Sequence, residues 1–408
     1  MSETEPESEL KRTLGLPILI LYGLGTVLGA GIYVLIGEVA GRTGGYAPLS
    51  FLIASVLSGL TAFGFAELSG RFPKSAGEAV YVQEGFGRKD LSLVVGLMVA
   101  FAGIVSSAAI ANGFSGYLHT FIAVPDLWAI MGLIAVLTGL ACWGIAESVA
   151  AAAVLTVIEA GALVLIIVLG APEAIMSFGE PIVPVNGSIT GIAVLSGAVL
   201  AFYAFIGFED MVNVAEEVRD APRTMGRAIT WVVIVSTLVY VSIAFVAVRV
   251  VPPAELAASN APMTLLFERL TNLPPQVMSL IAMLAVVNGA LIQIIMAARV
   301  LYGLAQQGTL PAFLGKVHPT TRTPIIGTMI VGSVVLAVAL TLPLVTLAEV
   351  TSALILVVFT LVNLALIAVK LQGPAPEDVW QVHIAVPVLG TLSAATFAVF
   401  AIVEVVRT

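Results

Sequence analysis

Residues 25–32, Gly-Thr-Val-Leu-Gly-Ala-Gly-Ile, interrupt an apolar stretch that is long enough to cross a lipid bilayer. A second apolar stretch is interrupted in the same way by residues 203–209, Tyr-Ala-Phe-Ile-Gly-Phe-Glu. Lipid offers no partner to the N–H and C=O groups of an unwound backbone, so such a break is tolerated only where it lines a cavity enclosed by protein. Two breaks in corresponding halves of a chain are typical of the binding site of a transporter.

The composition indicates a polytopic membrane protein. Apolar residues make up 59% of the chain, charged residues only 10%, and the mean hydropathy is +1.09. A soluble domain carries about 25% charged residues. The net charge of −8 comes partly from an acidic N-terminal tail and does not point to nucleic acid. That tail lacks the basic region of a cleaved signal, so we expect the first span to be retained.

The single cysteine, Cys142, excludes an intramolecular disulfide and a cysteine-rich metal site. The three histidines have no ligand spacing between them. We therefore expect no metal and no cofactor. The sequence does not indicate an oligomeric state.

Apolar runs predict eleven membrane-spanning helices, and Glu159 is the only carboxylate inside them. An all-α fold follows, because an open sheet cannot satisfy its backbone in lipid. The runs are 13–37, 46–66, 91–118, 127–146, 148–171, 186–208, 228–248, 272–298, 323–348, 350–369 and 379–403.

The distribution of lysine and arginine predicts the orientation of these spans. With the N-terminus inside, twelve basic residues fall on inner segments and four on outer segments, which agrees with the positive-inside rule. We therefore expect a multi-pass protein of the cell membrane with a cytoplasmic N-terminus. The four outer residues are Arg42, Arg249, Arg269 and Arg407.

The two breaks fall in the first and the sixth span, so each opens a set of five. An odd number of spans inverts the second set relative to the first, which predicts a five-plus-five inverted repeat. The expected organisation is a cytoplasmic tail (1–12), a first repeat (13–171), an inverted second repeat (186–370) and an additional helix (379–405).

Four motifs lie in order along the chain: the break at 25–33, the Phe-Ala-Glu-Leu and Phe-Pro-Lys-Ser segments at 65–68 and 72–82, the Gly-Phe-Glu run at 205–223, and residues 298–311. Together they resemble the amino acid–polyamine–organocation (APC) superfamily, whose fold is LeuT-like. The resemblance covers nearly the whole chain and is nearest to prokaryotic relatives of the cationic amino acid transporters. The sequence departs from the family pattern in two places. At the inner end of the eighth span it has Ala298 where the family usually has serine, and Gln306-Gln307 where the family usually has Arg-Asp. In the fifth span it has Glu159 where many eukaryotic-like members carry lysine.

The chemistry of a helix break matches a free amino acid. Unpaired N–H groups at the start of the second half-helix favour a carboxylate, and unpaired carbonyls at the end of a first half-helix can accept from an ammonium. The alternative is that the glycines serve close helix packing. By resemblance Tyr203 takes the place of a gate residue, and Tyr203 and Phe205 are candidates for an aromatic lid. The predicted substrate-binding residues are Thr26, Val27, Gly29, Ala30, Gly31, Tyr203, Ala204, Phe205, Ile206 and Gly207.

Three further polar residues are candidates. Glu159 lies about midway along the fifth span, where a carboxylate costs about 2.5–3.5 kcal/mol unless it is paired, protonated or wetted. We predict that it binds a coupling proton; the alternative is a structural carboxylate bonded to the first break. Glu209 is a second candidate for proton or ion coupling; the alternative is that it caps freed backbone donors. Asn288 is a possible pocket residue.

The sequence predicts a secondary active transporter that moves α-amino acids by alternating access, and symport with protons is the expected coupling. Neutral amino acids are favoured, since no fixed anion for a cationic side chain is evident apart from Glu209. A cationic amino acid or polyamine transporter of the same fold is the alternative. No P-loop is present, so ATP is not the direct energy source. A channel or an intramembrane enzyme is disfavoured, because the breaks are paired and the spans hold a single carboxylate and no lysine.

Overall fold

The computed structural model describes residues 14–74, 77–144, 149–177, 191–306 and 308–407, and these form helices without a β-strand. An isolated bridge pairs Leu14 with Val218. The α-helices are α1 (Leu16–Val27), α2 (Ala30–Thr43), α3 (Ala47–Arg71), α4 (Gly77–Phe86), α5 (Lys89–Leu118), α6 (Asp126–Trp143), α7 (Val149–Met176), α8 (Gly191–Phe205), α9 (Ala221–Val250), α10 (Pro253–Ala258), α11 (Pro262–Leu270), α12 (Gln276–Gln306), α13 (Ile325–Thr341), α14 (Leu344–Gln372) and α15 (Ala385–Arg407). The 3-10 helices are η1 (Gly44–Tyr46), η2 (Phe208–Glu217) and η3 (Ala312–Gly315).

Among the described residues, nine helical segments are long and apolar enough to cross a membrane. One of them, Ala30–Arg71, contains both α2 and α3, and the helices α1 and α13 are apolar but shorter. The eleven predicted spans correspond to these nine segments and two shorter helices. The prediction of an all-α polytopic membrane protein is confirmed, whereas the inverted repeat stays a prediction.

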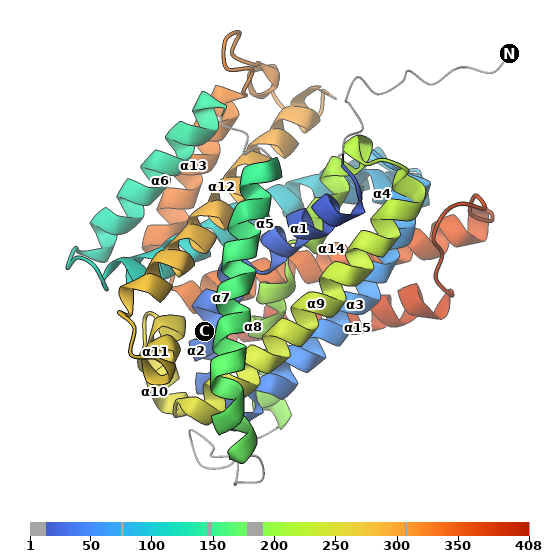
Figure 1. Cartoon of the computed structure of the whole chain (residues 1–408). Coiled ribbons are helices and arrows are strands. Elements are labelled where there is room, and N and C mark those ends of the chain that lie inside the picture. Colours follow the sequence, from blue (N-terminus) through green and yellow to red (C-terminus); the bar gives the residue numbers. More distant parts are fainter. Residues whose placement is uncertain (1–13, 75–76, 145–148, 178–190, 307, 408) are drawn as a thin grey trace, which may run out of the picture.

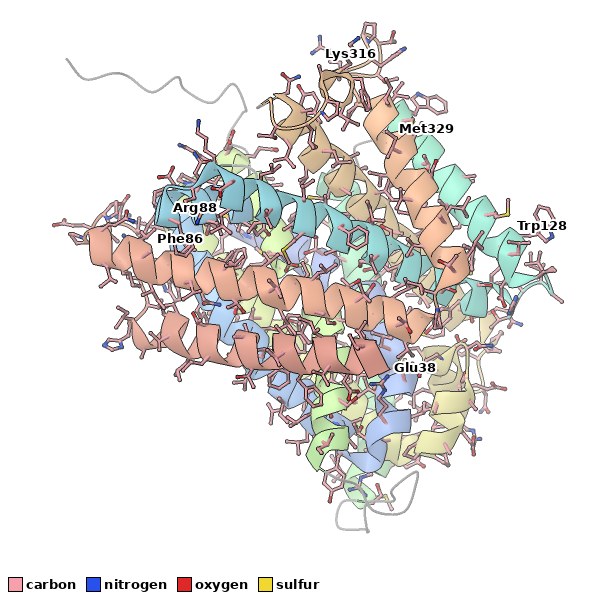
Figure 2. The ribbon with its side chains drawn as sticks, turned by 180° about the vertical axis from the view of Figure 1, so that it is seen from behind. Glu38, Phe86, Arg88, Trp128, Lys316 and Met329 are labelled. Atoms are coloured by element: carbon pink, nitrogen blue, oxygen red, sulfur yellow. The ribbon has the colours of Figure 1, made fainter. Side chains whose placement is uncertain are left out.

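The helices around the two breaks pack directly on one another. α1 packs against α7 and α9, α2 packs against α8, and α5 packs against α12. The paired helices α6 and α13 lie at one side of the molecule, and α3 and α15 lie at the other (Figure 1). From behind, α14 and α15 run side by side, with Phe86 and Arg88 near one end of the pair and Glu38 near the other (Figure 2). The breaks therefore lie within the bundle.

Two predicted span boundaries are wrong. The run 323–348 does not form one helix, because α13 ends at Thr341 and Pro343 starts the next helix from an extended backbone. Glu349 consequently lies inside α14. The second span likewise continues to Arg71 and includes Glu67. Glu159 is therefore not the only carboxylate within the spans.

Glu67 and Glu349 are both buried in ion pairs. Glu67 accepts from Arg71 at 2.7 Å, from the Lys370 ammonium at 2.7 Å and from the Val382 N–H at 2.9 Å. Glu349 is 1% exposed and pairs with Arg42 of α2 at 2.6 Å. The first pair joins α3 to α14, and the second joins α2 to α14.

Replacing Arg42 with methionine should lower the thermal stability markedly. It leaves the Glu349 carboxylate buried without its partner, and breaking a buried pair costs about 3–5 kcal/mol. The matched control is Arg269→Met, because the Arg269–Glu255 pair is about half exposed on both sides and such pairs contribute about 1 kcal/mol or less. Unfolding midpoints in detergent measure the difference, and equal shifts in the two variants would contradict this reading.

Candidate functional site

The first break separates α1 from α2 at Leu28 and Gly29. The Leu28 N–H still donates to the Leu24 carbonyl at 2.7 Å, which completes the last turn of α1. Gly29 then turns the chain with φ −64° and ψ −135°, and α2 begins at Ala30. The first N–H groups of α2 have no partner within the helix, and Gly29 has no side chain to cap them. The break therefore leaves the first N–H groups of α2 without a partner inside the helix.

The second break separates α8 from η2 at Ile206 and Gly207. Gly207 has φ +130°, a conformation that residues with a side chain rarely adopt, and a Cβ atom there would lie 2.5 Å from the Thr26 carbonyl oxygen. The backbone of the second break thus touches the backbone of α1 just before the first break. The Gly207 N–H donates to the Glu209 carboxylate at 2.9 Å. Glu209 accordingly caps a freed backbone donor, one of the two roles expected for it.

The two breaks meet again through Tyr240 of α9. Its hydroxyl donates to the Val27 carbonyl and also lies 3.0 Å from the Ala204 carbonyl oxygen. These carbonyls belong to the last turns of α1 and α8, which have no partner within their own helices. Tyr240 therefore ties the two half-helices together from the side of α9.

A cavity lies between the breaks and is called the central cavity below. It offers about 30 Å³ of space for the centres of water molecules, which is room for about two of them. Seven of the predicted binding residues line it: Thr26, Val27, Ala30, Gly31, Tyr203, Ala204 and Ile206. The remaining lining residues are Ser106, Ile110, Asp210, Gly289, Ile292 and Gln293.

Three predicted binding residues do not line this cavity. Gly29 and Gly207 form the breaks themselves, and the ring of Phe205 packs edge-on against Tyr240 with centroids 4.9 Å apart. Tyr203 does line the cavity, and its hydroxyl lies 3.0 Å from the Ser106 hydroxyl of α5. Of the two candidate lid aromatics, Tyr203 lines the cavity and Phe205 does not.

Close packing and cavity lining coincide at Gly31. A Cβ atom on this residue would lie 2.4 Å from the Ala204 Cα, so α2 and α8 pack too closely here for a larger residue. The same residue lines the central cavity. At Gly31, therefore, close helix packing and a role in the binding site are compatible, and the structure does not oppose one to the other.

Glu159 is buried in α7 beside the breaks and does not line the central cavity. Its backbone carbonyl accepts from the Tyr33 hydroxyl of α2 at 2.9 Å. Its carboxylate is close enough to interact electrostatically with Tyr33 and Tyr240. Asn288 is also buried and does not line the cavity, although the next residue, Gly289, does.

Sequence reasoning missed Asp210 and Gln293. Asp210 is 5% exposed, and its carboxylate accepts from the Gln293 amide of α12 at 3.3 Å. Asp210 directly follows Glu209, so its position beside the second break was a signal that could have been used. Gln293 is a polar side chain in the middle of a long apolar helix, a signal of the same kind as Asn288.

Comparison with known proteins identifies the family of this chain. The model of the family described as amino acid permease matches residues 14–407. Three similar proteins differ in the substrate for which they are named. The branched-chain amino acid permease BcaP of Bacillus subtilis is 25% identical, covering 92% of this chain and 84% of its own length. The methylthioribose transporter of the same bacterium is 26% identical, and the match covers 97% of this chain and 88% of the transporter's length.

The third similar protein is the mitochondrial cationic amino acid transporter 3 of Arabidopsis thaliana. It is 29% identical over 90% of this chain, and the chain spans 64% of the plant protein's length. The match of the family model over nearly the whole chain decides the assignment. The chain belongs to the amino acid permease family of the APC superfamily.

Proposed function

We propose that this chain is a secondary active transporter that carries α-amino acids across the cell membrane by alternating access, and not an enzyme or a channel. The observation that carries the proposal is the meeting of two helix breaks around one cavity, with Gly207 against Thr26 and Tyr240 on both. A continuous pore would not need paired breaks.

The two breaks suit the two ends of an amino acid. The first turn of α2, from Ala30, offers N–H groups and the positive end of the helix dipole to the carboxylate. The last turns of α1 and α8 offer carbonyls to the ammonium. The Tyr240 hydroxyl already donates to the Val27 and Ala204 carbonyls. We therefore expect the ammonium to bind other carbonyls of these two turns.

The small size of the central cavity implies that helices must separate to admit a substrate. On the predicted outer side, α2 and α5 touch where a Cβ atom on Gly113 would lie 2.5 Å from Val34. Beyond this contact lies a larger hollow of about 240 Å³ lined by both residues. On the predicted inner side, the Leu14 N–H donates to the Glu217 carbonyl at 3.0 Å, and the Arg219 N–H donates to the Leu14 carbonyl at 2.9 Å. In alternating access, the contact between α2 and α5 would open in the outward-facing state. The backbone contact of Leu14 would open in the inward-facing state.

Proton coupling through Glu159 is part of the proposal. Glu159 is buried, and its backbone carbonyl accepts from the Tyr33 hydroxyl of α2, the half-helix that follows the first break. A change of its charge would therefore be felt beside the binding site. The excess of basic residues on inner segments supports a cytoplasmic N-terminus.

Transport by the purified chain in proteoliposomes tests the function. We expect saturable uptake of at least one labelled α-amino acid, and exchange against the same amino acid inside. N-acetylated and decarboxylated analogues should not compete, because each lacks one of the two charged groups that the breaks bind. Linear, non-saturating flux would indicate a channel and would overturn the proposal.

The relatives' names do not agree on a side chain, and they include branched-chain and cationic amino acids. The sequence favoured neutral amino acids because no fixed anion in the pocket was evident apart from Glu209. Asp210 lines the central cavity, so this reason no longer holds. The neutral preference stays a prediction without that support.

A further inference from the structure

Helix α12 passes directly beside the first break. A Cβ atom on Gly29 would lie 3.8 Å from the Ala285 carbonyl oxygen of α12. One turn further along α12, a Cβ atom on Gly289 would lie 4.0 Å from the Ala30 backbone nitrogen. Ala30 begins α2, so this nitrogen carries the first N–H group of the half-helix. Gly289 therefore lies beside a donor that the proposed function assigns to the carboxylate of the substrate.

Gly289 has room for a side chain, and that room belongs to the central cavity, which Gly289 lines. The atoms nearest to a Cβ atom there would be the Ile110 Cδ1 at 3.6 Å, the Ala30 Cβ at 3.8 Å and the Ala30 nitrogen at 4.0 Å. These are ordinary van der Waals distances, so alanine would fit without displacing its neighbours. The missing side chain leaves a space of about one methyl group between α12, α5 and the start of α2.

The close packing that requires glycine elsewhere in the site does not apply at Gly289. A Cβ atom on Gly31 would lie 2.4 Å from the Ala204 Cα, and one on Gly207 would lie 2.5 Å from the Thr26 carbonyl oxygen. Contacts this short exclude any side chain, so backbone packing accounts for both of these glycines. Inside a helix glycine is less stable than alanine, and at Gly289 what a methyl group would take away is space in the cavity.

The central cavity has a second end, which is distinct from the surroundings of Gly289. At that end it shares lining residues with a neighbouring cavity, which Ala30, Ile110 and Gly289 do not line. We expect the side chain of the substrate to point to the shared end, which leaves the end at Gly289 for the carboxylate. The shared residues are Ser106, Ile206, Asp210 and Gln293.

We propose that the space in front of Gly289 is part of the carboxylate site, and that Gly289 determines whether a carboxylate can reach the first N–H groups of α2. An oxygen that accepts from the Ala30 N–H lies about 2.9 Å from the nitrogen. A methyl group on residue 289 would take up the same space. Gly289 is thus specific for the end that all α-amino acids share. This inference rests on the proposed function, because it assumes that the breaks bind the backbone of the substrate.

The test compares Gly289→Ala with the wild-type chain in proteoliposomes. Labelled alanine, leucine and lysine are used, and KM is measured for each one that the wild-type chain transports. We expect every KM to rise by the same factor, about five- to hundredfold, as when one methyl group overfills a close-fitting site. The maximal rate should change little, because the added group opposes binding and leaves both breaks intact.

The matched control is Gly303→Ala, the same change in the same helix. Gly303 has open space where a Cβ atom would be placed and lines neither cavity, so its KM values should equal those of the wild-type chain. The unfolding midpoint of Gly289→Ala in detergent should equal or exceed the wild-type value, because alanine fits and favours the helix. A marked fall of the midpoint would mean that Gly289 serves packing, and would overturn the inference.

The remaining outcomes separate the inference from the proposed function. A KM that rises for leucine or lysine but not for alanine would mean that the space holds the side chain, and an unchanged KM would mean that no part of the substrate lies there. Either result would overturn the inference while the wild-type chain still transports amino acids. Absence of uptake of any amino acid by the wild-type chain would overturn the proposed function, and the inference with it.

Discussion

Replacing Gly207 with alanine is expected to abolish uptake of every amino acid. The residue has φ +130°, and holding a side chain in such a conformation costs about 1–3 kcal/mol. The added Cβ atom would also lie 2.5 Å from the Thr26 carbonyl oxygen, which is backbone and cannot turn away. The second break would have to move from the first, and the binding site would lose its shape. Initial rates of uptake into proteoliposomes measure the effect.

The matched control for this variant is Gly161→Ala. Gly161 lies in α7 with open space where a Cβ atom would be placed, so alanine there should leave uptake near the wild-type rate. Comparable expression and a comparable elution profile in detergent would show that Gly207→Ala still folds. Wild-type uptake by a folded Gly207→Ala protein would mean that the contact between the two breaks is not required for transport.

Replacing Glu159 with glutamine is expected to remove accumulation driven by a proton gradient while sparing exchange. In the proposed coupling, the carboxylate takes a proton on the acidic side and releases it on the other side, and glutamine can do neither. One proton per substrate corresponds to about 1.4 kcal/mol for each pH unit of gradient, which is up to about tenfold accumulation. With the outside more acidic, uptake by the wild-type chain should rise, and uptake by the variant should not change.

The control for Glu159→Gln is Glu173→Gln, the same change at an exposed position of the same helix. It should accumulate substrate like the wild-type chain. Exchange of internal for external substrate is measured in parallel, because a variant that has lost the binding site would fail in both assays. Gradient-driven accumulation that survives in Glu159→Gln would place the coupling elsewhere.

The positions of the breaks could be predicted from sequence because glycine-rich backbone inside an apolar span has few explanations. The span boundaries were less predictable. The run 323–348 reads as continuous on hydropathy alone, and the helix end at Thr341 is set by Pro343. Glu349 was placed between spans for the same reason, and its burial depends on Arg42, a partner that is more than 300 residues away in the chain.

The lining of the site was predictable only in part. The residues of the breaks could be named because the breaks define them. Tyr203 and Phe205 are both aromatic, so residue type did not indicate which of them lines the cavity. Residues two apart on a helix point in different directions, and only Tyr203 lines the cavity. On α12 the sequence is apolar on all sides, so no periodicity indicated that Gln293, and not Asn288, lines the cavity.

Tyr240 and Asp210 matter through tertiary contacts that no local pattern reveals. Tyr240 is one of three aromatic residues in a long apolar helix, and its importance comes from two carbonyls on other helices. Asp210 reads as part of an acidic inner link, and the fold turns it into the cavity through the short 3-10 helix that follows Gly207. In both cases the backbone break decides which side chain reaches the site.

The most direct test is an experimental structure of the full chain with a transported amino acid bound. We predict that the substrate lies between the breaks, with its carboxylate within hydrogen-bonding distance of the N–H groups at the start of α2 and its ammonium on carbonyls that end α1 or α8. A map in which the first and the sixth span are continuous helices, or in which the substrate lies away from both breaks, would contradict the account.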